Sequence, residues 1–445
     1  MHYSEWHCSS RPGERSFQAC KPGGGKRGQM VKSIGCVFLL LTLLTGPAWQ
    51  KPAASSIALQ PPSQPIPSFF FGLHIHQAGG ATPWPPFPVF AWRLWDADVS
   101  WTFLQPQRDE WNFKSLDRYS ELAGQNHTEI MLTLGYTPRW AASRPDEVST
   151  SGMPGVASPP ANIGAWRDYV RTVATRYKGK IHVYEIWNEA NLPGYYSGTV
   201  SEMVTLAKEA YIVLKEIDST NIVVSPAVEG GGSSVRWLDD FLSHGGGNYC
   251  DVIGHHFYVS PEPPEAMLKD IDEVKQSLKR HRVNKPVWNT ESGWFTNKTF
   301  VDDEERTGYL ARAYLLAWAA GIERFYWYAY DNYLMSLPLT LPDRRTLNPA
   351  GRAYATLQSW LINSRLKSCV RDAGFSWTCV LARPDGSTAW ITWTSAKPGT
   401  RAVPDGCCRN MEIHYLDGRV ESGDRAKSLA VGSAPVLIAD KKSRQ

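Results

Sequence analysis

Short and almost continuously apolar runs recur along the middle of the chain, and amphipathic segments separate many of them. The runs are FFFGLHIH near residue 70, AWRLWD near 92, EIMLTLGY near 130, IHVYEIWNE near 184, NIVVSPAV near 223, DVIGHHFY near 253, KPVWNTESG near 287 and ERFYWYAYDN near 325. Such runs are typical of buried parallel strands. Segments between them, such as SEMVTLAKEAYIVLKEI, show the i, i+3, i+4, i+7 apolar spacing of a helix.

Eight strand and helix units at a spacing of roughly 35 residues predict an α/β fold, a (β/α)8 TIM barrel over 68–351. A doubly wound open sheet is the competing arrangement. From residue 352 the pattern changes to short alternating runs, TAWITWTS, NMEIHYLDG and APVLIAD, between Gly, Pro and Asp turns. This second pattern predicts a small antiparallel β-sandwich domain over 352–445.

The first part of the chain has the pattern of an export signal. Residues 30–50, MVKSIGCVFLLLTLLTGPAWQ, place a Lys before a short apolar run and small residues after it, as in a secretory signal peptide. The run is too short for a permanent membrane helix, so we expect no membrane anchor in the mature chain. Residues 1–29 are a leader or a mis-assigned start, and the Pro- and Ser-rich residues 51–67 are a linker. The expected location is secreted or periplasmic.

The charge of the chain indicates which kinds of partner it can bind, and its cysteines bear on whether its compartment is oxidising. Without residues 1–50 the chain has 41 basic and 41 acidic residues, so nothing indicates a nucleic-acid partner. A turn in SCVRDAGFSWTCVLAR could bring Cys369 and Cys379 together across a hairpin. An exported compartment would allow the two to form a disulfide, and free thiols are the alternative.

Polar and aromatic residues gather where six of the eight runs end. The functional groups of TIM barrels project from the carboxyl ends of the strands. The residues at these ends are His74 and His76 on the first run, Arg93 and Asp96 on the second, Asn188 and Glu189 on the fourth, His256 and Tyr258 on the sixth, Glu291 on the seventh and Trp327 on the eighth.

Two carboxylates on opposite sides of one barrel mouth indicate glycoside hydrolysis. In that reaction one carboxyl group protonates the leaving oxygen while the other attacks the anomeric carbon or activates water. Glu189 is the candidate acid, Glu291 the candidate nucleophile, and Asn188 a candidate ligand of a substrate hydroxyl. Retaining enzymes hold the pair about 5 to 5.5 Å apart. We therefore predict carboxyl groups within about 6 Å of each other.

The motifs IWNEANL and WNTESGW, with HFY between them, resemble the signatures of glycoside hydrolase clan A. FFGLHIHQ and WRLWDADVSWTFLQPQRDEWNFKSLD resemble family 39, especially its bacterial exopolysaccharide-cleaving endoglycosidases. The resemblance covers residues 69–335 and implies a retaining mechanism, with Glu189 as acid/base and Glu291 as nucleophile. It also implies supporting residues in the sugar subsite, namely Asn188 toward a hydroxyl, Arg93, His256 and Tyr258 around the nucleophile, and Trp327 as the floor. Ala190 departs from the Pro of many relatives.

Two other classes of function stay open. A metal-dependent hydrolase could use His74 and His76 with His255 or His256 and Asp331, but we expect no metal or other cofactor and take His74 and His76 as sugar ligands or buried histidines. A glycan-binding protein without activity is the other class, although both glutamates are present. Aromatic residues in the loops, Trp140, Trp294, Tyr195 and Tyr196, pack in the core or stack on sugars at outer subsites.

The expected substrate is a polysaccharide or oligosaccharide. The long segment 136–165 can wall a cleft or close a pocket. We expect endo action, with an exo-acting β-xylosidase-like activity as the alternative. The sequence predicts no particular sugar, linkage or oligomeric state.

Overall fold

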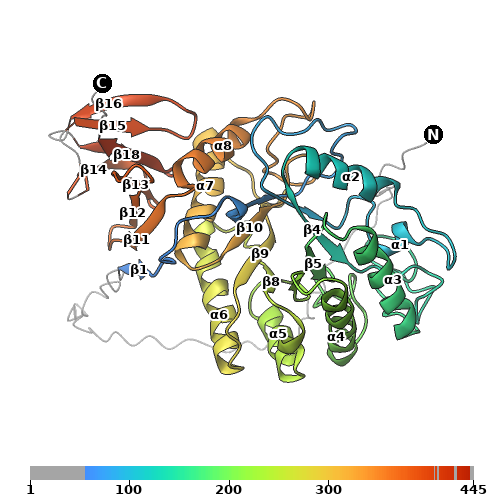
Figure 1. Cartoon of the computed structure of the whole chain (residues 1–445). Coiled ribbons are helices and arrows are strands. Elements are labelled where there is room, and N and C mark those ends of the chain that lie inside the picture. Colours follow the sequence, from blue (N-terminus) through green and yellow to red (C-terminus); the bar gives the residue numbers. More distant parts are fainter. Residues whose placement is uncertain (1–55, 405, 408–409, 425–427, 441–445) are drawn as a thin grey trace, which may run out of the picture. The chain divides into compact units, whose positions relative to one another are not determined.

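Two sheets organise the chain in the computed structural model, which describes residues 56–404, 406–407, 410–424 and 428–440 (Figure 1). The parallel strands are β2 (Phe71–Leu73), β3 (Ala91–Leu94), β4 (Glu129–Leu134), β5 (Val183–Ile186), β6 (Ile222–Val224), β7 (Val228–Glu229), β8 (Ile253–His256), β9 (Val287–Ser292) and β10 (Arg324–Trp327). β6 and β7 share the fifth barrel position, and a bridge from Val224 to Val252 closes the ring. The predicted TIM barrel is confirmed.

Helices follow most of the barrel strands and cover their outer faces. They are α1 (Trp101–Leu104), α2 (Lys114–Gln125), α3 (Ile163–Arg176), α4 (Val200–Ile217), α5 (Ser233–Ser243), α6 (Met267–Arg280), α7 (Asp303–Ala319) and α8 (Pro349–Leu361). Three single turns of 3-10 helix, at Ser68–Phe70, Gly246–Tyr249 and Pro264–Ala266, complete the helical elements that the structure describes. The connection between β2 and β3 has no helix, because four prolines in ATPWPPFPVF remove the backbone donors that a helix needs.

The inside of the barrel has an apolar layer below a polar one. The apolar layer consists of Ala91, Met131, Val183, Val224, Val252, Trp288 and Tyr326. Side chains alternate between the faces of a strand, so residues two positions further along also point inward. Those residues on β3, β4 and β5 are Arg93, Thr133 and Glu185, all buried. The interior of the barrel thus changes from apolar to polar just below the mouth.

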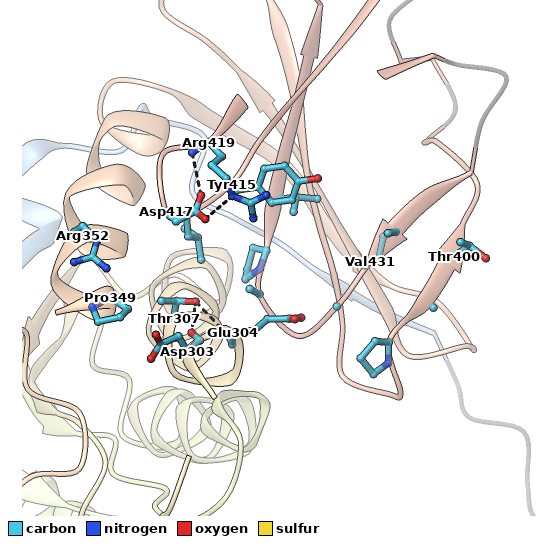
Figure 2. A pocket seen from close by; sticks show the side chains of 18 residues that line it. Asp303, Glu304, Thr307, Pro349, Arg352, Thr400, Tyr415, Asp417, Arg419 and Val431 are labelled. Carbon is cyan, nitrogen blue, oxygen red and sulfur yellow. Dashed lines mark hydrogen bonds and ion pairs between the residues drawn. The ribbon is translucent and has the colours of Figure 1, made fainter. Parts of the chain in front are cut away.

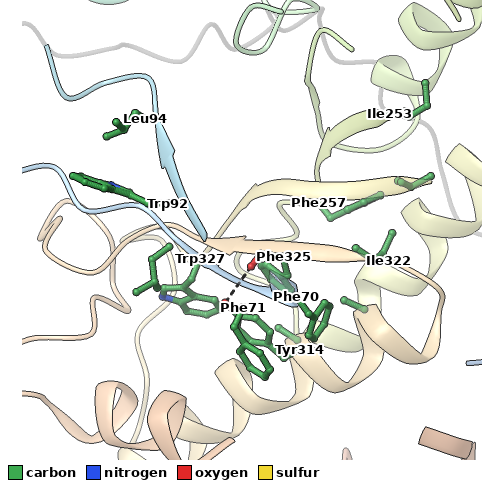
Figure 3. Close-up of a cluster of buried hydrophobic side chains, with 14 of the residues drawn as sticks. Phe70, Phe71, Trp92, Leu94, Ile253, Phe257, Tyr314, Ile322, Phe325 and Trp327 are labelled. Carbon is green, nitrogen blue, oxygen red and sulfur yellow. Dashed lines mark hydrogen bonds between the residues drawn. The ribbon is translucent and has the colours of Figure 1, made fainter. Parts of the chain in front are cut away.

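The outer faces of the strands pack against the helices in a second apolar core (Figure 3). There the ring of Tyr314 from α7 stacks on Phe71 of β2 at 5.0 Å and on Phe325 of β10 at 4.4 Å. Trp327 lies in the same cluster, 6.1 Å from Tyr314. Stacked aromatic rings of this kind bury large apolar areas and fix the position of α7 on the barrel.

The second sheet is antiparallel and forms the predicted β-sandwich domain together with a small two-stranded sheet. In sheet order its seven strands are β1 (Ile57–Leu59), β11 (Arg365–Arg371), β12 (Ser376–Ala382), β13 (Thr388–Thr394), β18 (Val436–Asp440), β15 (Asn410–His414) and β16 (Val420–Asp424). The two-stranded sheet pairs β14 (Gly399–Arg401) with β17 (Leu429–Val431). Cys369 and Cys379 are register partners across the β11–β12 hairpin and form a disulfide.

The domain boundaries differ from the sequence prediction at two places. Residues 51–67 were expected to form a linker, but Ile57–Leu59 pairs with β11 as an edge strand. The boundary expected at 351/352 falls inside α8, which packs on the barrel, where the hydroxyl of Tyr354 donates to the carbonyl of Gly72 at 3.4 Å. The expected leader and signal peptide lie outside the described residues. Among the described helices none is long and apolar enough to cross a membrane.

The β-sandwich domain contacts the barrel at α7. The indole of Trp393 donates to Glu265 Oε1 at 3.1 Å, and Arg312 of α7 donates to the same oxygen at 3.1 Å. Beside this contact lies an open hollow of about 960 Å³ between α7, α8 and the sandwich strands (Figure 2). Glu304, Thr307 and residues of the β15–β16 hairpin line it. Neither Glu189 nor Glu291 is among its lining residues, so this hollow is separate from the barrel mouth.

Candidate active site

Glu189 and Glu291 face each other at the carboxyl end of the barrel. One carboxylate oxygen of each and one ring nitrogen of His256 all lie within 4.8 Å of one another. Glu189 follows β5, Glu291 lies on β9, and the two residues are 7% and 5% exposed. The expected approach of the two carboxyl groups to within about 6 Å is confirmed. A sugar carbon placed between these oxygens would be within reach of both.

The Trp-Asn-Glu triplet is a turn that directs Glu189 into the mouth. Trp187 and Glu189 have φ of 67° and 46°, a left-handed conformation that costs on the order of 1 kcal/mol or more for such residues. The Trp187 indole donates to the carbonyl of Tyr195 at 2.8 Å, and the amide of Ala190 donates to the carbonyl of Ala227 at 3.0 Å. These bonds hold the strained turn in place and with it the carboxylate.

Arg93 connects the catalytic pair to the polar layer inside the barrel. Its Nη1 donates to Glu291 Oε2 at 2.7 Å, and its Nη2 donates to Asn188 Oδ1 at 2.8 Å. Nε and Nη2 also donate to Glu185 Oε2 at 2.8 and 2.5 Å, and the hydroxyl of Thr133 donates to the same oxygen at 2.8 Å. Glu185 was not predicted as a site residue, although a Glu on the inward side of a buried strand is itself a signal that it has a partner.

We expect Glu185→Ala to lower the free energy of unfolding by about 3–5 kcal/mol, because it leaves the Arg93 charge buried with fewer partners. Urea unfolding measures this change. The matched control is Glu216→Ala, which removes a carboxylate paired with Arg171 where both side chains are about half exposed. Its expected effect is below about 1 kcal/mol. Equal effects of the two substitutions would show that Glu185 does not compensate Arg93.

Burial raises the pKa of both Glu189 and Glu291 to about 7. Two carboxylates this close repel each other when both are ionised. The pair therefore titrates in two steps, and between these steps it holds a single proton. Glu291 accepts from Arg93 and, at 2.9 Å, from the hydroxyl of Tyr258. Glu189 has only the Nδ1 of His256, at 3.0 Å, and burial lowers the pKa of that histidine to about 4. The proton therefore stays on Glu189, and Glu291 is the ionised member.

Of the residues predicted around the nucleophile, Arg93 and Tyr258 hydrogen-bond Glu291, whereas His256 bonds the acid Glu189. Arg93 also donates to Asn188. The amide nitrogen of Asn188 is buried and has no hydrogen-bond partner in the described structure. Since an unpaired buried donor is costly, this nitrogen is available to a substrate hydroxyl next to the anomeric carbon.

His76 belongs to a charged cluster beside the pair. Its Nε2 bonds Asp96 Oδ2 at 2.7 Å and its Nδ1 bonds Asp331 Oδ1 at 3.2 Å. Burial alone would lower the pKa of His76, but the two carboxylates raise it to about 10. The hydroxyl of Tyr328 also donates to Asp96 Oδ2, at 2.6 Å. His76 is thus a cation held between two anions. The contacts of Asp331 and Tyr328 in this cluster were not predicted from the sequence.

Trp327 does not lie in the sugar subsite, and that prediction is wrong. Tyr326 points into the barrel, so by alternation Trp327 points outward, where it is fully buried against α7. Its indole donates to the carbonyl of Leu337 at 3.2 Å. Tyr328, the next inward residue, is partly exposed at the mouth and takes the position that was expected for Trp327.

For Trp294, Trp140 and His74 the structure shows the buried or core-packed alternative and not the role of a sugar ligand. Trp294 is fully buried, with its ring 5.8 Å from Trp327 on the outer side of the barrel. Trp140 packs edge-on to Trp101 at 6.1 Å and donates to the carbonyl of Gln105. His74 is buried behind Tyr328, and its Nε2 bonds the carbonyl of Thr290 at 3.1 Å. In this conformation the buried Trp294 and His74 cannot touch a sugar, and Trp140 is occupied by core contacts.

Other aromatic residues flank the pair on both sides. On one side the rings of Tyr136 and Tyr195 stack 6.4 Å apart, and Trp95 lies edge-on 6.0 Å from Tyr195. On the other side Phe295, which is 41% exposed, stacks on Tyr258 at 4.6 Å. Trp95 and Tyr195 on one side and Phe295 on the other are at least partly exposed and suited to stacking on sugars, whereas Tyr136 and Tyr258 are buried. Of these residues, Tyr195 and Tyr258 were predicted from the sequence as site candidates.

The metal site considered from the sequence does not assemble. His74 and His255 bond the carbonyls of Thr290 and Gly230, and His256 bonds Glu189. His76 meets Asp331, but both of its ring nitrogens are bonded to carboxylates. A protonated histidine cannot be a metal ligand, because coordination needs the neutral ring. The proposed ligands therefore point to different partners and do not converge.

Comparison with known families identifies the class of protein. The family model described as the glycosyl hydrolase catalytic core matches residues 161–354, and that of glycosyl hydrolase family 10 matches residues 95–212. A search of curated proteins finds no match. The first match includes both Glu189 and Glu291. The chain is a glycoside hydrolase, and the metal-dependent and purely glycan-binding classes are not needed to explain it.

Solved structures show the same fold. A family 39 glycoside hydrolase from the gut symbiont Bacteroides cellulosilyticus WH2 is 17% identical, with a TM-score of 0.68 over 85% of this chain and 81% of that chain. A glucosidase from Croceicoccus marinus is 13% identical, with a TM-score of 0.63 over 86% and 98%. A monomeric β-xylosidase from Caulobacter crescentus CB15 is 16% identical, with a TM-score of 0.58 over 79% and 89%. The fold of this chain is therefore like that of these glycoside hydrolases, among them a family 39 enzyme.

Proposed function

We propose that the protein is an exported retaining glycoside hydrolase that cleaves a polysaccharide or oligosaccharide by double displacement. We further propose that it is endo-acting, so that it cleaves bonds inside the substrate chain. The observation that carries the proposal is the approach of Glu189 and Glu291 to within 4.8 Å. Inverting enzymes leave roughly 6.5 to 9.5 Å between the two groups for a water molecule. The space between this pair suits direct attack by a carboxylate.

In the first step Glu291 attacks the anomeric carbon while Glu189 gives its proton to the leaving oxygen. The bond from the carbon to that oxygen breaks, and an ester between the sugar and Glu291 forms. The Asn188 amide donates to the neighbouring hydroxyl. As Glu291 loses its negative charge, Arg93 keeps the carboxylate of Glu185 as its partner. The cation is therefore never left uncompensated in the buried site.

In the second step Glu189, now ionised, removes a proton from a water molecule, and the oxygen of that water attacks the anomeric carbon. The ester bond breaks and Glu291 recovers its charge. Two inversions at one carbon give net retention. Glu189 has then regained a proton from the water and Glu291 the electron pair of the broken ester bond, while the first proton stays on the leaving group, so the two glutamates are ready for the next cycle.

The anomeric configuration of the first product tests the proposal. We expect proton NMR of a digest in progress to show the configuration of the substrate before mutarotation mixes the two forms. If the first product has the opposite configuration, Glu291 is not the nucleophile, even should both glutamates be essential. Digestion of a panel of neutral and acidic polysaccharides supplies the substrate for this measurement.

Aromatic faces on both sides of the pair support endo action, because sugar rings can bind on either side of the cleaved bond. The low exposure of Glu189 and Glu291, at 7% and 5%, favours the alternative, an exo-acting β-xylosidase-like activity in a closed pocket. Product sizing distinguishes the two: a ladder of oligosaccharides supports endo action, and monosaccharide alone supports exo action. Export is supported by the expected signal peptide and by the Cys369–Cys379 disulfide, since such bonds persist in oxidising compartments.

A further inference from the structure

We propose that Asp96 determines which sugar binds beside Glu291: its carboxylate accepts hydrogen bonds from the hydroxyl groups of an uncharged glycosyl unit and excludes a uronic acid from that subsite. The inference rests on the proposed glycosidase function and adds a substrate class to it.

The position of Asp96 follows from the order of the strands. Asp96 comes two residues after the end of β3, and the strand order β3–β2–β10–β9 places His76, Tyr328 and Glu291 next around the mouth. Arg93, on β3 itself, already touches Glu291 at 2.7 Å. Asp96 therefore stands at the same mouth as the nucleophile, on the side opposite to β8, where His256 and Tyr258 fill the space.

One oxygen of Asp96 is fully occupied and the other is not. Oδ2 accepts from His76 Nε2 at 2.7 Å and from the Tyr328 hydroxyl at 2.6 Å. Oδ1 has no hydrogen-bond partner among the described residues, and the side chain is 20% exposed. The two bonds to Oδ2 fix the plane of the carboxylate. A fixed and accessible acceptor beside the nucleophile is a site for a sugar hydroxyl.

The balance of charge at the mouth explains why Asp96 would exclude a uronic acid. Arg93 is neutralised by Glu185, and His76 is held by Asp331, whose side chain is fully buried. Asp96 and the one charge of the glutamate pair then remain as negative charges toward the opening. These charges would repel a sugar carboxylate, and among the described residues of the mouth there is no unpaired cation to bind it. A sugar hydroxyl instead donates to Asp96.

The test compares sugars that differ only in this charge. The probes are matched 4-nitrophenyl glycosides, glucoside with glucuronide and galactoside with galacturonide, together with a panel of neutral and uronic-acid polysaccharides. We expect the wild-type protein to cleave the neutral member of a pair with a kcat/KM on the order of 10³-fold higher than the uronide. Where only a polysaccharide is cleaved, mass spectrometry of the new reducing end should show an uncharged sugar.

Two variants of Asp96 separate its charge from its shape. Asp96→Asn should raise KM for the neutral substrate and lower its preference over the uronide by at least about tenfold. Asp96→Glu keeps the charge and should still reject the uronide, while it cleaves the neutral substrate less well. The control is Asp98→Asn, an exposed acid on the same segment with φ 59°, a conformation that Asn accepts. It should leave the preference unchanged. Near-ultraviolet circular dichroism checks that each variant is folded.

The outcomes distinguish this inference from the proposed function. If hydrolysis requires Glu189 and Glu291 but the uronide is cleaved as well as its neutral partner, the inference is wrong and the glycosidase proposal stands. An unchanged preference in a folded Asp96→Asn variant, or a uronic acid at the new reducing end, overturns it in the same way. If no glycoside or polysaccharide is cleaved by the wild-type protein, the proposed function fails and the inference fails with it.

Discussion

Glu291→Ala should lower kcat by roughly 10⁵-fold or more while the protein stays folded, because no ester can form without the carboxylate. The variant keeps the Arg93–Glu185 pair, so the buried cation still has a carboxylate partner. Added azide should restore part of the turnover of an activated aryl glycoside by entering the vacated space. The product would then be a glycosyl azide with inverted configuration, because only one displacement occurs.

The matched control for this experiment is Glu262→Ala, which removes an exposed carboxylate from the loop after β8. It should leave kcat within about twofold of the wild-type value, as expected for a surface substitution. A Glu291→Ala variant with near-wild-type turnover would remove Glu291 from the mechanism. A loss of turnover without azide rescue, but with altered circular dichroism, would indicate a structural effect instead.

Glu189→Gln should slow the cleavage of natural glycosides by about 10²–10⁴-fold and have a much smaller effect on a dinitrophenyl glycoside. A natural leaving group needs a proton in the first step, whereas an activated phenolate leaves without one. With the activated substrate the second step becomes rate-limiting, and a burst of released phenol should appear. Equal losses on both substrates would contradict the assignment of Glu189 as the acid.

The same variant tests the pH dependence. In the wild-type protein kcat/KM should rise as Glu291 ionises and fall as Glu189 loses its proton. Burial raises the pKa of both groups to about 7, so the coupled pair should give a bell-shaped profile with its maximum near neutral pH. The basic limb belongs to Glu189 and is lost as the pH rises through its pKa. In Glu189→Gln, measured on the activated substrate, this limb should disappear and the acidic limb remain.

The barrel and the catalytic pair could be predicted from the sequence because both depend on regular spacing. Eight apolar runs with helical segments between most of them define the barrel, and polar residues at the ends of the runs then share one mouth. Glu189 and Glu291 stand out because each interrupts or ends a buried strand. A carboxylate at such a place needs a partner or a function.

The residues that were misplaced depend on features that spacing does not determine. Trp327 and Tyr328 are neighbours, and only the register of β10 against β9 and β2 decides which of them points inward. Trp294 is an aromatic residue in a loop, and its burial depends on where α7 packs. The cluster of Asp96, His76 and Asp331 joins residues from the segments that follow three different strands, β3, β2 and β10. Its contacts become visible only when those strands are placed side by side.

The pairing of Ile57–Leu59 with β11 has a consequence for how the chain is made. Ile57 leaves the ribosome early, whereas its register partner, Arg371, is more than 300 residues further along the chain. The sheet therefore cannot be completed until almost the whole protein has been synthesised and, for an exported chain, until the last segment has crossed the membrane. Pairing over so long a separation is a slow event in folding. A fragment that ends after α8 would lack β11, so the amide and carbonyl groups of Ile57–Leu59 would have lost their partners and become an exposed edge that favours aggregation.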